Sequence, residues 1–184
     1  MRPTTVGACG REELGCSPVQ AGVFFAWQEV ASFLTDWTVA LLETAATTRG
    51  VALLRIRQAA TLLGACGNAV CVVCLGRCRR QLPAAACCWG AAAFYTAHHS
   101  GFGANLLEVG GTQTAMLNAV NNMIKSSAGI ISPALGVLLR RWSGSWRPLF
   151  NLCAILHVGS AIVFSVFAKT KPAKRFRDQQ IPLM

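Results

Sequence analysis

Five apolar runs, separated by short basic segments, divide the sequence. Four of the runs contain at most one charged residue, and the first carries two acids, Glu29 and Asp36. A run of about 20 apolar residues is long enough for a helix to cross a bilayer. Backbone amides cannot stay unpaired in lipid, so each run is predicted to be a helix. The predicted spans lie near residues 22–42, 58–76, 82–107, 112–139 and 148–168.

The pattern predicts an all-α fold, a polytopic transmembrane helical bundle of about five spans. Residues 1–20 lack the uninterrupted apolar core of a secretory signal and are predicted to be an irregular lead-in. Residues 169–184 form a basic tail that an anionic leaflet would attract. The competing class is a soluble helical protein with a large core.

Composition favours the membrane class. The 184 residues are 53% hydrophobic and 13% charged, whereas soluble domains carry about 25% charged residues. A net charge of +10 would suit nucleic-acid binding, but the cations lie between and after the apolar runs, as in loops beside a membrane. We therefore expect a lipid bilayer as partner and no nucleic acid.

Enzymatic, cofactor and metal chemistry are not expected. The sequence has no Gly-rich phosphate loop and no Ser/His/acid set in an interpretable context. Six of the nine cysteines fall within apolar runs, where Cys acts as a small hydrophobe. No paired Cys or His cluster completes a four-ligand metal site in the sequence.

The distribution of cations predicts the orientation. Four predicted helices separate the loop that contains Arg49 and Arg57 from the tail, so both lie on one side, which holds eight cations. The opposite side holds six, Arg77, Arg79, Arg80, Arg140, Arg141 and Arg147. The positive-inside rule therefore favours a cytoplasmic tail in an integral membrane protein.

Lys125 is the sharpest candidate for function. It lies near the middle of its span, too deep for easy snorkelling, and polar groups at that depth usually face a protein interior or a watery cavity. It either faces an anionic substrate pathway, pairs with an acid, or is a tolerated substitution. Glu108 is about five helical turns away along a straight helix, so Glu29 or Asp36 is the better-placed acid.

Other polar residues surround this position in the sequence. Asn105 and Glu108 are neighbours on one helix face, and Glu108 is expected to cap the start of the next helix at residues 110–113. His98 and His99 could relay protons or simply pack. Adjacent residues point about 100° apart on a helix, so at most one of the two histidines is expected to face the interior.

The loop from Thr48 to Arg57, T-R-G-V-A-L-L-R-I-R, resembles a stretch of the anion:cation symporter family within the major facilitator superfamily. That family includes sodium–phosphate cotransporters, vesicular glutamate transporters, sialin and plant anion transporters, and its stretch has S-R-G followed by a short run ending V-R-K. Arg49 and Arg57 are the arginines of this loop motif. Asp36 resembles the acid of the family's G-x-x-A-D element, at the end of helix eight.

A second stretch, residues 101–136, extends the resemblance. The matching positions are Gly101 and Asn105, Glu108 where the family has Asp, Asn122 of an S-N pair, and Gly129, Pro133 and Gly136 of a G-x-x-x-P-x-x-G pattern. Three features depart from the family. Leu106 replaces a His, Gly111 and Thr112 replace Pro-Arg, and Lys125 replaces a small residue.

The resemblance implies helices eight to twelve of a twelve-helix transporter. Such transporters hold their substrate between two halves near the bilayer midplane, so this chain is expected not to transport alone. If an N-terminal half completed it, the substrate would be a small anion such as phosphate or an organic anion, coupled to sodium or protons. The alternatives are a truncated version of a longer product and a small non-transporting protein that binds a partner through its Gly129–Gly136 face.

Overall fold

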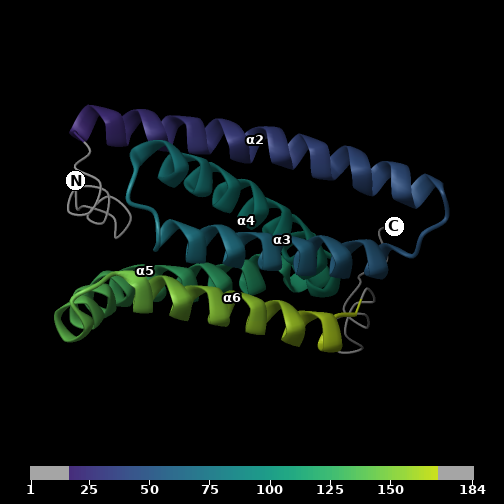
Figure 1. Cartoon of the computed structure of the whole chain (residues 1–184). Coiled ribbons are helices and arrows are strands. Elements are labelled where there is room, and N and C mark those ends of the chain that lie inside the picture. Colours follow the sequence, from purple (N-terminus) through teal and green to yellow (C-terminus); the bar gives the residue numbers. More distant parts are fainter. Residues whose placement is uncertain (1–16, 170–184) are drawn as a thin grey trace.

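The computed structural model describes residues 17–169, which form a bundle of long helices (Figure 1). The elements are α2 (Pro18–Thr48), α3 (Leu53–Leu75), α4 (Gln81–Gly110), the short 3₁₀ turn η1 (Gly111–Gln113), α5 (Thr114–Ser143) and α6 (Arg147–Phe167). No strand occurs in this part of the chain. The predicted all-α bundle is therefore confirmed. Most of the predicted lead-in and basic tail lie outside the described residues.

The helices pack around a central pair, α3 and α4. α6 packs against α3, and α2 packs against α4, so α2 and α6 lie on opposite sides of the pair (Figure 1). α5 makes far fewer contacts than the others, with short stretches of α4 and α6. Most of its surface is therefore uncovered in the described bundle.

The distribution of side-chain size is that of a protein in lipid. Most of the buried apolar side chains are alanines, and Ala65 and Ala161 are fully buried. Large apolar side chains instead point outward, as with Trp37 on α2, Ile130 on α5 and Phe167 on α6. Small residues allow close helix contact in lipid, where the outer surface has no reason to be polar.

Three of the described helices, α3, α5 and α6, are long and apolar enough to cross a membrane. Together with the outward-facing large apolar residues, they make this an integral membrane protein. Helices α2 and α4 coincide with the other two predicted runs but are not among these three. Their passage through the membrane stays a prediction.

The helix ends correct two sequence expectations. The loop expected from Glu43 to Arg57 is reduced to residues 49–52, because α2 continues to Thr48 and α3 begins at Leu53. The turn expected at residues 108–111 lies at residues 111–113 instead, because α4 continues to Gly110. Its first residue, Gly111, has a φ of 49° that favours glycine. Charged residues mark the end of the apolar run, but a helix can continue past that point into a polar environment.

Two glycines set the contact between α3 and α4. A Cβ on Gly64 of α3 would lie 2.4 Å from the backbone nitrogen of His98. A Cβ on Gly101 of α4 would lie 2.6 Å from the backbone oxygen of Arg57. Real Cβ atoms do not approach backbone so closely, so the helices could not keep this spacing with larger residues.

We predict that Gly64→Ala lowers the free energy of unfolding by about 1–3 kcal/mol, the usual cost of overpacking. The added methyl group would meet backbone atoms of α4, which cannot rotate away. Unfolding of the full chain in mixed detergent micelles, followed by circular dichroism during a denaturing-detergent titration, measures the effect.

Gly159→Ala is the matched control. Gly159 lies inside α6, and a Cβ there would meet nothing within 4 Å. Alanine also has the higher helix propensity, so this variant should be neutral or slightly stabilised. Equal losses in the two variants would show that close packing at Gly64 does not limit stability.

Candidate functional site

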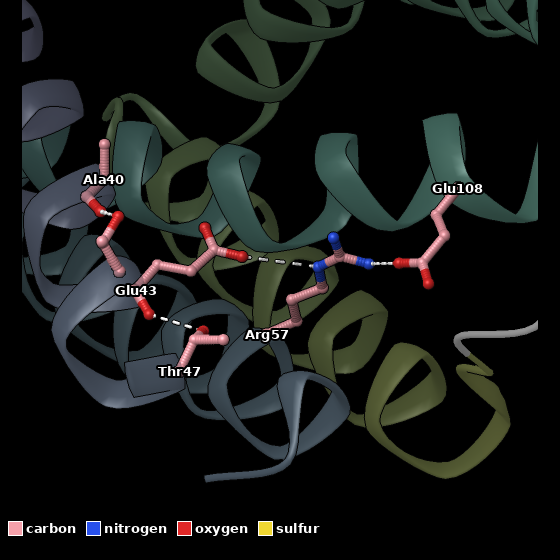
Figure 2. Close-up of polar contacts among 6 residues, drawn as sticks. Ala40, Glu43, Thr47, Arg57 and Glu108 are labelled. Carbon is pink, nitrogen blue, oxygen red and sulfur yellow. Dashed lines mark hydrogen bonds and ion pairs between the residues drawn. The ribbon is translucent and has the colours of Figure 1, made fainter. Parts of the chain in front are cut away.

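A buried arginine connects three helices at the end of the bundle where α2 joins α3 (Figure 2). Arg57 lies near the start of α3, and its side chain is 10% exposed. Its Nε lies 3.6 Å from Glu43 Oε1 of α2, and its Nη1 donates a hydrogen bond to Glu108 Oε2 of α4. A guanidinium offers several donors in a rigid plane, so one arginine can contact two carboxylates at once.

These ion pairs revise the expected roles of two acids. Glu108 does not cap the next helix, since η1 has no side-chain cap hydrogen bond. Thr114 instead makes the local contacts, and its Oγ1 donates to the carbonyl oxygen of Gly111 at 2.6 Å. Asp36, expected at the end of a helix, lies within α2 well before its end at Thr48. Glu43, and not Asp36, is the acid of α2 that pairs with Arg57.

A pocket of about 570 Å³ opens between α2, α4 and α5, and more than half of its lining residues are polar. Its polar lining residues are Asp36, Glu43, His99, Ser100, Asn118, Asn121, Asn122 and Lys125. The volume is in the range of small-molecule sites. Four of the candidates from the sequence, Asp36, His99, Asn122 and Lys125, are thus brought together here.

Lys125 makes its side-chain contact with a histidine rather than with an acid. Its Nζ lies 3.1 Å from His99 Nε2 across the pocket. An ammonium group can only donate, so His99 accepts through Nε2 and is the neutral tautomer with its proton on Nδ1. Asp36 lines the same pocket, whereas Glu29 does not.

The two adjacent histidines face different helices. His98 lies against α3 and α6, with Nδ1 3.2 Å from the carbonyl oxygen of Thr61 and its ring centroid 4.5 Å from that of His157. His99 lines the pocket. Sequence reasoning overlooked His157, although it too is a histidine within a charge-free run.

The remaining candidates lie away from the pocket. Asn105 is buried on the face of α4 that also carries Gly101 and Glu108, and its Oδ1 has no hydrogen-bond partner among the described residues. Arg49 is exposed at the end of α2. Gly129 and Pro133 are exposed on α5, whereas Gly136 is buried. The small-residue face is therefore largely uncovered within residues 17–169.

The charges of the pocket are mixed. Asp36 and Glu43 carry negative charge, Lys125 carries positive charge, and the neutral His99 adds none. Arg57 offsets much of the charge of Glu43 from outside the pocket lining. What remains is a lysine facing one uncompensated carboxylate across the pocket, with asparagine amides on the side of α5.

No family model matches the sequence. The chain is 26% identical, over 123 residues, to the voltage-gated purine nucleotide uniporter SLC17A9 of Rattus norvegicus, and equally to those of Mus musculus and Homo sapiens. The match covers 67% of this chain and spans 28% of the length of each relative. The similarity supports a relationship to membrane transporters of the SLC17 and major facilitator type, without reaching a subfamily.

We predict that Arg57→Leu lowers the free energy of unfolding by about 2–3 kcal/mol. The change leaves two carboxylates without their cation. The loss should fall below the range for fully buried pairs because the side chains of Glu43 and Glu108 are 29% and 34% exposed. The detergent-titration assay used for Gly64→Ala provides the measurement.

Arg55→Leu removes an exposed arginine two residues earlier and should have little effect. Adding Glu108→Gln to Arg57→Leu should recover part of the loss, since it removes one uncompensated charge. Additive losses in the double variant would argue against a direct interaction between the two side chains.

Proposed function

We propose that this chain is the C-terminal portion of a major facilitator-type transporter for an organic anion, and that the pocket between α2, α4 and α5 is part of its substrate pathway. The observation that carries the proposal is Lys125, an exposed cation on an apolar helix that lines this pocket and contacts His99. Charged residues within membrane spans are costly and often mark ion or substrate pathways. Enzymatic activity forms no part of the proposal.

The geometry of the pocket is consistent with an incomplete binding site. α5 contributes Lys125 and three asparagines, yet it is the helix least covered by its neighbours. Transporters of this class bind substrate at the interface of two halves. A second set of helices lying against α2, α4 and α5 would enclose the pocket and add further groups to it.

Purine nucleotides are the first substrates to test, because the relatives from rat, mouse and human are named as nucleotide uniporters. Inorganic phosphate and organic anions other than nucleotides remain within the proposal. A uniporter needs no coupling ion, whereas the resemblance to symporters favours sodium or protons. Proton coupling would have a physical route here, since a proton on His99 Nε2 would break the hydrogen bond to Lys125 and add a second cation to the pocket.

A non-transporting membrane protein that binds a partner is the second candidate function. A Cβ on Gly129 would meet nothing within 4 Å, so this part of α5 has no neighbour among the described helices. Small residues at such a surface allow another helix to approach closely. The same surface is compatible with the missing half of a transporter, so a functional test must address the pocket.

We predict that nucleotide protects a cysteine at position 125 from modification. Lys125→Cys, in a background with the nine native cysteines replaced, is reconstituted with the seven N-terminal helices of the rat uniporter and treated with a charged, membrane-impermeant thiol reagent. If the pocket lies in the pathway, ATP should slow labelling about ten-fold. Mass spectrometry of the intact chain measures the labelled fraction.

Ser143→Cys is the control because Ser143 is exposed at the C-terminal end of α5, beyond the apolar run, and does not line the pocket. ATP should leave its labelling unchanged. Equal effects of ATP at both positions, or no effect at position 125, would exclude a pathway role. If the cysteine at position 125 is labelled from neither side of the membrane, and Lys125→Leu raises the unfolding temperature, then Lys125 destabilises the fold and has no pathway role.

A further inference from the structure

Two connections meet at the end of the bundle opposite the Arg57 ion pairs, where α3 turns into α4 and α5 turns into α6 (Figure 1). Between them lies a second pocket, of about 500 Å³. Three arginines line it, Arg77 and Arg79 from the first connection and Arg147 from the start of α6. We propose that this pocket binds a phosphate group, independently of any transport through the α2/α4/α5 pocket.

A packed apolar cluster fixes the positions of the two connections. Trp146, which lines the pocket, is 5% exposed and belongs to a buried cluster with Leu75 and Phe150. Gly76 approaches the same cluster, since a Cβ there would lie 2.9 Å from the Phe150 ring. The backbone on both sides of the pocket is therefore anchored, and the arginines project from fixed positions.

The turn at Gly144 brings the second connection to the pocket. Gly144 ends α5 with φ 68°, and its N–H donates to the carbonyl oxygen of Arg140 at 2.8 Å. The next residues reverse the chain, and Ser145 Oγ accepts a hydrogen bond from the N–H of Arg147 at 3.2 Å. Arg147 thereby begins α6 at the pocket wall, where the positive end of the helix dipole adds to its charge.

The charge of this pocket differs from that of the α2/α4/α5 pocket. No Asp or Glu is among its lining residues, which are Leu75, Gly76, Arg77, Cys78, Arg79, Gly144, Ser145, Trp146 and Arg147. Three arginines and no acid line this cavity, so its charge favours an anion. Guanidinium forks match phosphate oxygens in geometry and can bind them through two parallel hydrogen bonds.

The donors that remain available are sufficient for a phosphate. Arg77 Nη1 donates to the carbonyl oxygen of Val73 at 2.9 Å, which uses one of the five N–H donors of a guanidinium. Arg79 and Arg147 are exposed side chains at the rim of the pocket. The phosphate oxygens would replace water as their acceptors.

The position along the helices makes two phosphate sources accessible. α3, α5 and α6 are the helices that can cross a membrane, so their ends at these connections lie near the level of the lipid headgroups. Trp142, 82% exposed two residues before Gly144, suits that interfacial depth. The ligand is therefore the headgroup of an anionic phospholipid or a soluble phosphate compound, which share the same recognition chemistry.

The test compares two double variants of the full chain that remove equal charge at the same end of the bundle. R79Q/R147Q removes two arginines of the pocket lining, and R80Q/R141Q removes two exposed arginines that do not line it. Inorganic phosphate binding is measured by calorimetry in a neutral detergent. Retention of phosphatidylglycerol is measured by native mass spectrometry. The protein is first extracted from phosphatidylcholine nanodiscs in which about one lipid in five is phosphatidylglycerol.

In R79Q/R147Q we expect the dissociation constant for at least one of the two probes to rise about ten-fold or more, since hydrogen bonds to charged groups are stronger than neutral ones. R80Q/R141Q should stay within about two-fold of the unmodified chain, allowing for the weak effect of exposed charges. Binding of inorganic phosphate identifies a soluble source, and retention of phosphatidylglycerol alone identifies the lipid. Equal effects in both double variants, or binding of neither probe by the unmodified chain, overturn the proposal.

R79K/R147K separates a built site from general attraction. It keeps the net charge but loses the guanidinium forks, so binding should weaken several-fold although the charge is unchanged. If the circular dichroism of R79Q/R147Q shows that it fails to fold, R79K/R147K replaces it in the binding measurements. Unchanged binding in R79K/R147K would indicate diffuse attraction between cations and anions and would likewise overturn the proposal.

Discussion

The close approach of α3 to α4 is the constraint on which the rest of the bundle depends. Gly64 and Gly101 leave room for backbone to meet backbone, and at that spacing Arg57 lies within reach of Glu108. Because α6 packs against α3 and α2 packs against α4, the position of every outer helix follows from this pair. Alanines make up most of the buried apolar residues, and apart from the cluster around Trp146 most large apolar side chains point outward.

The bundle keeps its charged groups in three separate environments. Arg57 and its two carboxylates form an ion-paired set that connects helices. Lys125 belongs to a polar pocket of mixed charge, where a neutral histidine is its direct partner. The arginines at the other end of the bundle line a pocket without acids. Ion pairing suits a structural role, whereas Lys125 and the three arginines of the other pocket form no ion pair among residues 17–169 and are the cations available to ligands.

Hydrophobic runs were enough to predict an all-helical chain, because in lipid a long apolar segment has few alternatives to a helix. The helix ends were misplaced, since α2 continues to Thr48 beyond its apolar run. The pairing of Arg57 with Glu108 joins residues 51 positions apart and depends on the rotation of two helices, which hydrophobicity does not specify. For Lys125 the sequence argument considered only acids and anionic substrates as partners. A neutral histidine can accept the same hydrogen bond, and that possibility appears only when α4 and α5 are placed in space.

The sparse packing of α5 has a consequence for biosynthesis. This helix carries a lysine in its middle, and a central lysine costs about 2.5–3.5 kcal/mol on insertion scales. α5 also receives few contacts from α4 and α6 to offset that cost. Its insertion by the translocon would therefore depend on helices that are already in the membrane and can shield the ammonium group. The step at which α5 leaves the translocon is then the point where assembly of this protein is most sensitive to the presence of a partner.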